Sequence, residues 1–264
     1  MSRDWKKYLH EIRTREIQLV FSYFGEKKFK SGLEIGAGDG FQTRLLSNHC
    51  ETFISTDLNF SRIKEELKLP NVIYKQCDAD NLSGVFAEAQ FDFIFSSNVM
   101  EHLSRPSDFI HSTLTILSSD GYAVHIIPSR FLKFSYILLH FPNVFLLIYD
   151  RLIGLLYGKK IFRGEKNNFE NNINKEVVAS NRYTKVLFPQ VHGNYSSHFE
   201  EFIRFGRRSW EGIFSANGFV VEKYIKGPAF SGYGFNLRIL RRLLEYFGWS
   251  SEHIFILRKT QHAR

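Results

Sequence analysis

The residues of this chain best suited to chemistry begin with an octet at positions 33–40, which reads LEIGAGDG. Glu34 ends an apolar strand there, and glycines follow at alternate positions. Glycines at a sharp strand-to-helix turn let the backbone approach a ligand closely, and the amides of the following helix attract negative groups. The dinucleotide-binding pattern Gly-x-Gly-x-x-Gly requires glycine where this chain has Phe41. The octet therefore suits a pyrophosphate poorly, and Glu34 suits a cationic group on the ligand.

Two more acidic residues follow predicted strands. Residues 53–56 read as a strand that Asp57 ends, and residues 72–77 read as a strand that leads into Asp78. An acid at the tip of the second strand holds ribose hydroxyls in α/β nucleotide-binding folds. Each aspartate could equally be a turn acid or a helix cap, so both interpretations stay open at this point.

Hydrophobic periodicity and turn residues predict the elements that must position these side chains. The chain should open with a helix whose apolar residues run from Trp5 to Phe24 and which Gly25 caps. Further helices are predicted over 105–118 and 197–216, further strands over 91–95, 122–127, 219–225 and 253–258, and a turn over 117–121.

With these elements in order, residues 30–129 resemble the class I S-adenosylmethionine-dependent methyltransferases, in the branch that includes small-molecule and quinone methyltransferases. The resemblance implies an α/β, Rossmann-like fold. Its sheet would have seven mostly parallel strands with the last antiparallel, helices on both faces and a helical insertion after strand 5. The resemblance also implies S-adenosyl-L-methionine as the cofactor. The residues that it assigns to cofactor binding are Glu34, Gly36, Ala37, Gly38, Gly40, Asp57, Leu58, Asp78, Ala79 and Asn98.

The chain is expected to form a single methyltransferase domain over 1–264, a length within the range of one α/β unit with an insertion. An N-terminal helix (1–29) precedes the cofactor-binding core (30–129). An apolar helical insertion or lid (130–196) follows, and residues 197–264 complete the sheet.

The insertion contains an uncharged run of 16 residues, 134–149, which Pro142 is expected to break. A membrane-spanning helix needs about 20 apolar residues, so this run is too short to span a bilayer. Two interpretations remain open. The insertion is either a lid packed on the core, or a surface that dips into a bilayer with Lys159, Lys160 and Arg163 beside it.

A second amphipathic stretch lies near the C-terminus, with Leu237, Leu240 and Leu243 on one helical face and arginines on the other. It is either a membrane- or partner-binding helix or an ordinary surface helix with a solvated charged face. The chain carries 35 basic and 27 acidic residues, a net charge of +8 that favours anionic partners. Because no zinc-finger or RNP-type pattern is visible, an anionic membrane surface ranks above nucleic acid.

The remaining composition indicates a cytoplasmic enzyme, with attachment to the inner face of the membrane as an option. The N-terminus lacks the apolar core of a signal peptide. Two cysteines, Cys50 and Cys77, form neither a disulfide framework nor a metal-ligand pattern. The sequence leaves the oligomeric state open.

An oxygen acceptor must lose its proton during methyl transfer, usually to a histidine or a carboxylate. Glu101 and His102, just past the fourth strand, are candidates, although a histidine there can also be a capping or core residue. The segment from 189 through Trp210 to Phe219 resembles, more weakly, methyltransferases of bacterial surface-polysaccharide assembly. That resemblance would place His192 over the acceptor; the alternative is a loop histidine without a role. No cluster has metal-ligand spacing, so no metal is expected.

We therefore interpret the chain as a methyltransferase that methylates an oxygen of a sugar, a lipid-linked glycan or another small-molecule acceptor. One alternative is C-methylation of a quinone-like lipid. The other is a non-catalytic module that binds S-adenosylmethionine and serves as a scaffold in a glycan-assembly complex.

Overall fold

The computed structural model describes residues 5–86, 91–157, 189, 191–230 and 238–260. Contacts divide the chain into two compact units, which we describe separately. The first contains Met1–Lys133, Val191–Phe230 and Gly234–Arg264, and the second contains Phe134–Gln190 and Ser231–Tyr233. The expectation of a single domain stays a prediction.

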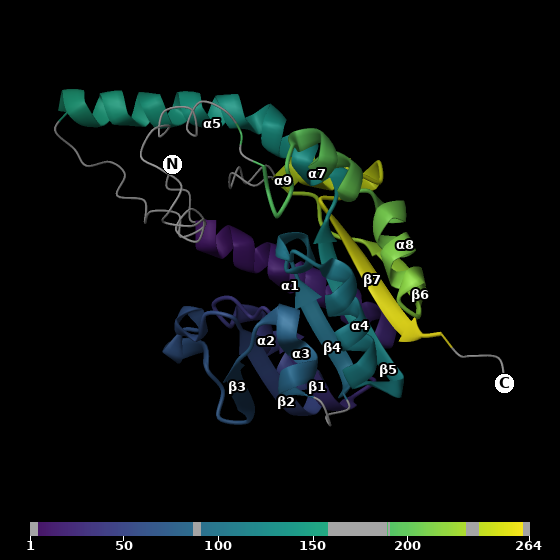
Figure 1. The fold of residues 1–264 in the computed structure, drawn as a ribbon. Helices are drawn as coiled ribbons and strands as arrows, with labels where there is room; N and C mark the ends of the chain where they lie inside the picture. The colour runs from purple at the N-terminus through teal and green to yellow at the C-terminus, as the bar shows by residue number, and fades with distance from the viewer. Residues whose placement is uncertain (1–4, 87–90, 158–188, 190, 231–237, 261–264) are drawn as a thin grey trace. The chain divides into compact units, whose positions relative to one another are not determined.

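The first unit is built on a seven-stranded sheet of order β3-β2-β1-β4-β5-β7-β6. The first five strands along the chain pair in parallel, and β7 runs antiparallel to both β5 and β6. This topology confirms the predicted fold class (Figure 1). The strands are β1 (Phe29–Ile35), β2 (Cys50–Asp57), β3 (Val72–Gln76), β4 (Phe91–Ser97), β5 (Leu117–Pro128), β6 (Phe219–Lys226) and β7 (Glu252–Lys259).

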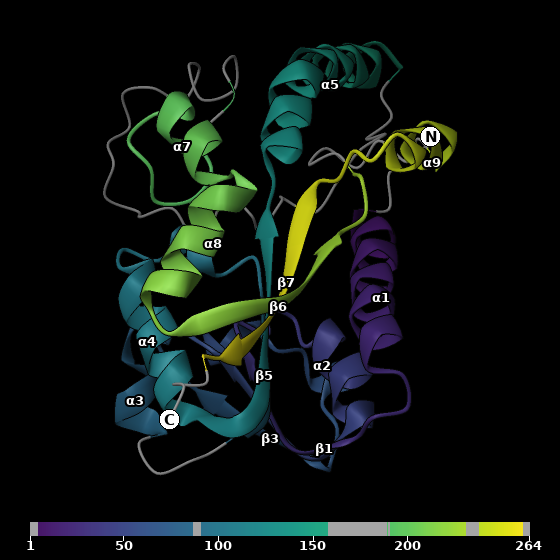
Figure 2. The ribbon, with the colours of Figure 1, turned by 90° about the vertical axis from the view of Figure 1, so that its right-hand side faces the viewer.

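Helices cover both faces of this sheet. Figure 2 shows α1 and α2 on one face and α4 and α8 on the other. Each face has its own apolar core: Val20 of α1 packs with Phe29 and Phe93 on one side, and Phe109 of α4 packs with Trp210 of α8 on the other. The α-helices of this unit are α1 (Trp5–Phe24), α2 (Phe41–Leu46), α3 (Leu82–Val85), α4 (Pro106–Ile116), α7 (His198–Arg204), α8 (Arg207–Ala216) and α9 (Arg238–Tyr246). Short 3₁₀ turns are η1 (Ser47–His49), η2 (Phe60–Arg62), η3 (Glu65–Leu67), η4 (Ala79–Asn81) and η5 (Met100–His102).

Two of the predicted elements are wrong in detail. The turn expected over 117–121 belongs to β5, because Leu117 is fully buried and pairs with Phe91 of β4. The pairing of the two strands shifts register after this point, so that the next paired residues are Phe93 and Tyr122. The single helix expected over 197–216 is two helices. Gly206 is extended, with φ −75° and ψ 137°, and it ends the first helix and starts the second.

The second unit contains α5 (Arg130–Tyr157) from Phe134 onward, and the first four residues of this helix belong to the first unit. The expectation that Pro142 breaks this segment is wrong, since the helix continues through it. A proline inside a helix removes one backbone donor and its ring crowds the carbonyl oxygen of the preceding turn, yet α5 runs on past Pro142 to Tyr157. Several large apolar side chains of α5 are exposed, Phe141 and Phe145 among them. Within the described residues, no helix is long and apolar enough to cross a bilayer. Lys159, Lys160 and Arg163 lie outside the described residues.

The helix α9 places part of its charged face against α1. In this contact Arg241 is 8% exposed and donates to Glu11 at 2.8 Å. Arg15 donates two hydrogen bonds to the carboxylate of Glu245, at 2.8 and 2.7 Å. The charged face is therefore only partly solvated, since Arg241 and Glu245 pair with α1 whereas Arg238 and Arg242 are exposed. The helix also exposes apolar side chains, with Ile239, Leu240, Leu243 and Tyr246 all at least half exposed or nearly so. Leu237 lies outside the described residues.

Candidate active site

The glycine loop after β1 requires its glycines for two different reasons. Gly36 has φ +79°, and a Cβ there would lie 2.4 Å from Cγ2 of Val99, so the loop packs directly against the segment after β4. Gly38 and Gly40 also have positive φ values, +60° and +85°. A Cβ on Gly38 would meet only a side-chain nitrogen of Arg62, at 4.0 Å. The space beside Gly38 is therefore open, as a bound cofactor requires.

Glu34 is a buried residue near the end of β1, directly before the glycine loop. It is 2% exposed, and its Oε2 accepts hydrogen bonds from the hydroxyl groups of Thr43 and Ser55, the latter at 3.1 Å. Burial raises the pKa of Glu34 to about 7. These bonds tie β1 to α2 and β2, so Glu34 positions the loop. Its direct contact with a cationic ligand group stays a prediction.

Asp57 lies at the tip of β2 and reaches across to the glycine loop. Its two carboxylate oxygens accept from the backbone amides of Gly38, at 2.8 Å, and of Asn59, at 2.9 Å. Asp57 is 4% exposed, whereas the following Leu58 is 61% exposed. A carboxylate with two oxygens has further acceptor capacity, so Asp57 can hold the loop and still accept from ribose hydroxyls.

Asp78 makes the contact of a turn acid. It is exposed, and its carboxylate accepts from the backbone amide of Asp80 at 3.0 Å, which caps the turn that begins at Ala79. The capping interpretation therefore describes its contacts in this structure. A role of Asp78 and Ala79 beside the adenine stays a prediction.

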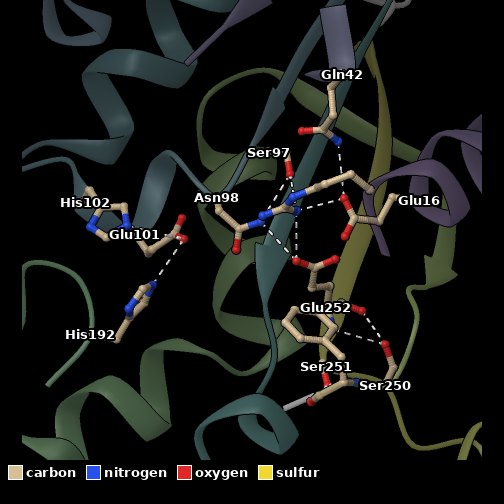
Figure 3. A network of polar contacts seen from close by, with 12 residues as sticks. Glu16, Gln42, Ser97, Asn98, Glu101, His102, His192, Ser250, Ser251 and Glu252 are labelled. Atoms are coloured by element: carbon tan, nitrogen blue, oxygen red, sulfur yellow. Dashed lines mark hydrogen bonds and ion pairs between the residues drawn. The ribbon is translucent and has the colours of Figure 1, made fainter. Parts of the chain in front are cut away.

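Asn98 directly follows β4 and takes part in a buried polar network that sequence reasoning missed (Figure 3). Its side-chain amide donates to Ser97 at 3.1 Å and to Glu252 at 3.0 Å. Arg13 of α1 donates to Glu16 and Ser97, each at 2.8 Å, and to Glu252 at 3.2 Å. Burial raises the pKa of Glu252, the neighbouring Glu16 raises it further, and Arg13 opposes both. The sequence signal was a charged residue, Glu252, at the head of the strand, shortly before the apolar run 254–257.

This network, together with a ring contact, fixes α1 over the edge of the sheet that carries the loop. The ring of His10 stacks on Phe41 with centroids 3.7 Å apart, and its Nε2 lies 3.3 Å from a carboxylate oxygen of Asp39. The N-terminal helix therefore packs against the glycine loop. Contact of Asn98 with the cofactor stays a prediction.

The structure brings together the three residues that were catalytic candidates, Glu101, His102 and His192 (Figure 3). Glu101 and His102 belong to η5, directly after β4. The Nε2 atoms of His102 and His192 each lie 3.8 Å from Oε1 of Glu101. The two imidazole rings meet edge to face, with centroids 4.9 Å apart. Burial lowers the pKa of His102.

The loop that carries His192 is fixed at two points. The backbone amide of Asn194 donates to the carbonyl oxygen of Glu101 at 2.9 Å. The backbone amide of His192 donates to Glu201 at 3.1 Å, and Glu201 also forms a buried ion pair with Lys133. Sequence reasoning missed Lys133 and Glu201, because nothing local in the chain marks them as partners.

This arrangement can position an acceptor and remove its proton. The packing of Val99 against Gly36 places the Glu101 cluster next to the glycine loop along the carboxyl edge of β1 and β4. A carboxylate beside two imidazoles can orient an imidazole and stabilise its charged form. The edge of the sheet therefore combines a cofactor loop with candidate general bases.

Comparisons with known proteins agree with this geometry. Residues 33–125 match the family described as a methyltransferase domain. Over 120 residues the chain is 23% identical to the ubiquinone biosynthesis O-methyltransferase of Acinetobacter baylyi, a match that covers 43% of this chain and 50% of that protein. The match thus spans about half the length of this curated relative.

Solved structures share the fold over most of the chain. A putative S-adenosylmethionine-dependent methyltransferase from Listeria monocytogenes has a TM-score of 0.55 and 12% identity, with 94% of this chain and 98% of that chain covered. A chain from the complex between the Haloferax volcanii Trm112 methyltransferase activator and the putative methyltransferase has a TM-score of 0.57 and 10% identity, with 98% and 95% covered. Residues 33–125 are therefore a methyltransferase domain, and the chain has the fold of the class I S-adenosylmethionine-dependent methyltransferases.

Proposed function

We propose that this chain uses S-adenosylmethionine to methylate a hydroxyl oxygen of a sugar, a lipid-linked glycan or another small-molecule acceptor. The observation that carries the proposal is the meeting of Glu101, His102 and His192 beside the glycine loop. The open space at Gly38 and the free acceptor capacity of Asp57 fit the cofactor.

When bound, the cofactor supplies a methyl group on a positively charged sulfur. The residues of this chain then have two tasks. The loop and the His192 segment align the acceptor with the methyl group, and alignment alone can lower a barrier by about 7–11 kcal/mol in the best cases. A histidine takes the acceptor proton as the new oxygen–carbon bond forms and the sulfur–carbon bond breaks, a contribution of about 10²–10⁴-fold.

A quinone-like ring is the second candidate acceptor. The relative from Acinetobacter baylyi is by name an O-methyltransferase of ubiquinone biosynthesis, which supports a ring acceptor as the alternative to a sugar. A phenolic hydroxyl could use the same histidines, and C-methylation of such a ring is the further alternative. A third reading, a non-catalytic scaffold in a glycan-assembly complex, predicts cofactor binding without methyl transfer.

We also propose that the chain attaches to an anionic membrane surface at its cytoplasmic face. Support comes from α9, whose Arg241 and Glu245 pair with Glu11 and Arg15 of α1 while Ile239, Leu243 and Tyr246 are exposed. Exposed aliphatic and aromatic residues on one helical face are typical of helices that lie in a bilayer interface. The net charge of +8 favours an anionic surface.

To test the acceptor, the purified chain is incubated with methyl-labelled S-adenosylmethionine and one of three acceptor sources: a membrane extract, a demethylquinone or a lipid-linked glycan fraction. The label that each product carries is then measured. Label in the glycan fraction supports the first acceptor class, and label in the quinone alone supports the second. Cofactor binding without label in any product would favour the scaffold. The product is then hydrolysed to show whether oxygen or carbon carries the methyl group.

A further inference from the structure

Glu101 is buried without the partners that a carboxylate normally collects. It is 1% exposed, and neither of its carboxylate oxygens accepts a hydrogen bond from the described part of the chain. Buried charged groups are usually paired with a hydrogen-bond donor, an opposite charge or a metal ion. The side-chain nitrogens nearest to it are the Nε2 atoms of His102 and His192, and at 3.8 Å they are too distant for hydrogen bonds.

We propose that Glu101, His102 and His192 bind one divalent transition-metal cation. One oxygen and two nitrogens, one from each residue, lie within 4.8 Å of one another. Ligand atoms that share a cation at about 2.1 Å lie about 3.0–3.5 Å apart. The two nitrogen–oxygen separations of 3.8 Å need a contraction of only a few tenths of an ångström, and the set as a whole, within 4.8 Å, closes further if the half-exposed side chain of His102 rotates.

The ligand set selects the class of cation. Two imidazoles and one carboxylate suit zinc, cobalt, manganese or iron, whereas magnesium and calcium prefer an all-oxygen set. Three protein ligands leave at least one coordination position open. The side chain of His102 is 48% exposed and that of His192 is 26% exposed, so an acceptor molecule can reach the open coordination position from solvent.

Contacts around the cluster hold two of the ligands in place. The carbonyl oxygen of Glu101 accepts from Asn194, and the backbone amide of His192 donates to Glu201. These contacts fix the two backbone segments that carry the ligands. The spacing of the ligands in the sequence predicted no metal, because His192 comes from a segment far from the adjacent pair Glu101 and His102.

The role of the cation rests on the proposed function and replaces one part of it: with His102 and His192 held as ligands, the cation, not a histidine base, activates the acceptor hydroxyl. A bound cation would take the acceptor hydroxyl in its open position and lower the pKa of that hydroxyl. The proton then leaves to a base or to solvent, the oxygen bonds to the methyl carbon, and the carbon–sulfur bond breaks with its electron pair going to sulfur. The cation is neither oxidised nor reduced.

The test measures binding directly on the full chain without a histidine tag, after treatment with a chelator. Zn²⁺ is titrated by calorimetry, and Co²⁺ by its visible absorption. We expect one site per chain, and at least about tenfold weaker binding in Glu101→Gln, His102→Ala and His192→Ala. The matched control is His111→Ala, which removes an exposed histidine from α4 and should leave binding unchanged. Absence of stoichiometric binding, or equal binding in all four variants, would overturn the inference.

Thermal melting guards against variants that fail to fold. Zn²⁺ should raise the melting temperature of the wild type and of His111→Ala but not that of Glu101→Gln. Methyl transfer separates this inference from the proposed function. A chain that binds Zn²⁺ at these residues and transfers no methyl group contradicts the function and keeps the site. Undiminished transfer by a chain shown to be metal-free contradicts the role of the cation in catalysis and keeps the proposed function, while the titrations decide the site itself.

Discussion

The backbone amide of Asn194 donates a 2.9 Å hydrogen bond to the carbonyl oxygen of Glu101. This bond joins the loop of His192 to the turn after β4, two segments that are far apart in the chain. The glycine between His192 and Asn194 makes the close approach possible. Gly193 has φ +82°, and a Cβ there would lie 2.4 Å from the same carbonyl oxygen.

Gly193→Ala should displace His192 without touching the cofactor loop. The added methyl group must push the loop away from Glu101, and a misplacement of about 1 Å can slow catalysis by about 10²-fold. We expect that loss in the methyl-transfer rate, with S-adenosylmethionine affinity unchanged by calorimetry. Gly212→Ala is the control, because a Cβ on that glycine meets nothing within 4 Å. Full activity of Gly193→Ala would separate His192 from the chemistry.

Replacing the histidines themselves should be more damaging. Each of His102→Ala and His192→Ala should lower turnover by about 10²–10⁴-fold while cofactor affinity is kept. The measurement is initial rate at saturating S-adenosylmethionine, beside a cofactor titration of the same preparations. Wild-type turnover in both single variants would remove histidine catalysis and leave alignment alone, or Glu101, as the explanation.

The cofactor assignment is tested at Asp57. Its carboxylate accepts a hydrogen bond from the amide of Gly38. Asp57→Ala therefore removes the predicted hydrogen-bond acceptor for the ribose hydroxyls and also loosens the glycine loop. S-adenosylmethionine binding should weaken by about 1.5–3 kcal/mol, the scale of a lost charge-assisted hydrogen bond. Gly38→Val should weaken it more, because a β-branched residue resists φ +60° and fills the open space.

The matched control for Asp57 is Asp120→Ala, since the Asp120 side chain is 88% exposed. Calorimetry should show normal S-adenosylmethionine affinity in this variant and no binding of NAD to the wild type. Unchanged affinity in both Asp57→Ala and Gly38→Val would contradict the placement of the cofactor.

Glu34 predicts a specific dependence of stability on pH. Because burial raises its pKa from 4.5 to about 7, the folded chain holds a proton that the unfolded chain releases between these values. Its contribution to the free energy of unfolding therefore falls as the pH rises from 4.5 to 7. Glu34→Gln removes this term, so the variant should gain roughly 3 kcal/mol relative to the wild type across that interval.

Urea unfolding of the cofactor-free protein at several pH values measures this difference. Glu65→Gln is the control, because the Glu65 side chain is 83% exposed and should give no such trend. A parallel pH dependence of the wild type and Glu34→Gln would mean that Glu34 is ionised in the folded state throughout.

Membrane attachment is tested by flotation with vesicles. The wild type should float with anionic vesicles, less with neutral ones, and added salt should weaken but not abolish the binding. Ile239→Ser with Leu243→Ser should reduce flotation while cofactor affinity is kept. Ile73→Ser is the control, since Ile73 is an equally apolar residue, 62% exposed on β3.

The double variant Phe141→Ser, Phe145→Ser distinguishes the two interpretations of the insertion. A membrane surface predicts lost flotation with an unchanged melting temperature. A lid predicts a large drop in melting temperature through lost packing, with no flotation even of the wild type at low salt.

Local features of the sequence were sufficient to predict the glycine loop after the first strand and its neighbour Asp57. The octet at 33–40 and Asp57 predicted the loop, because strand alternation and the positive φ values of glycines are properties of neighbouring residues. The same reasoning predicted the fold class through the order of strands. It failed at 117–121 and at Gly206, where burial of Leu117 and an extended glycine overrode the local pattern.

Only the tertiary structure decided how distant polar residues meet. The sequence presented Glu101, His102 and His192 as separate candidates, whereas the fold places them around one buried carboxylate. Likewise, periodicity predicted an apolar and a charged face for α9 but not which residues of the charged face pack against the fold. Those residues are set by Glu11 and Arg15 of α1. The reason is physical: side-chain periodicity is fixed by the local backbone, but the partner of a charged group is fixed by packing between segments far apart in the chain.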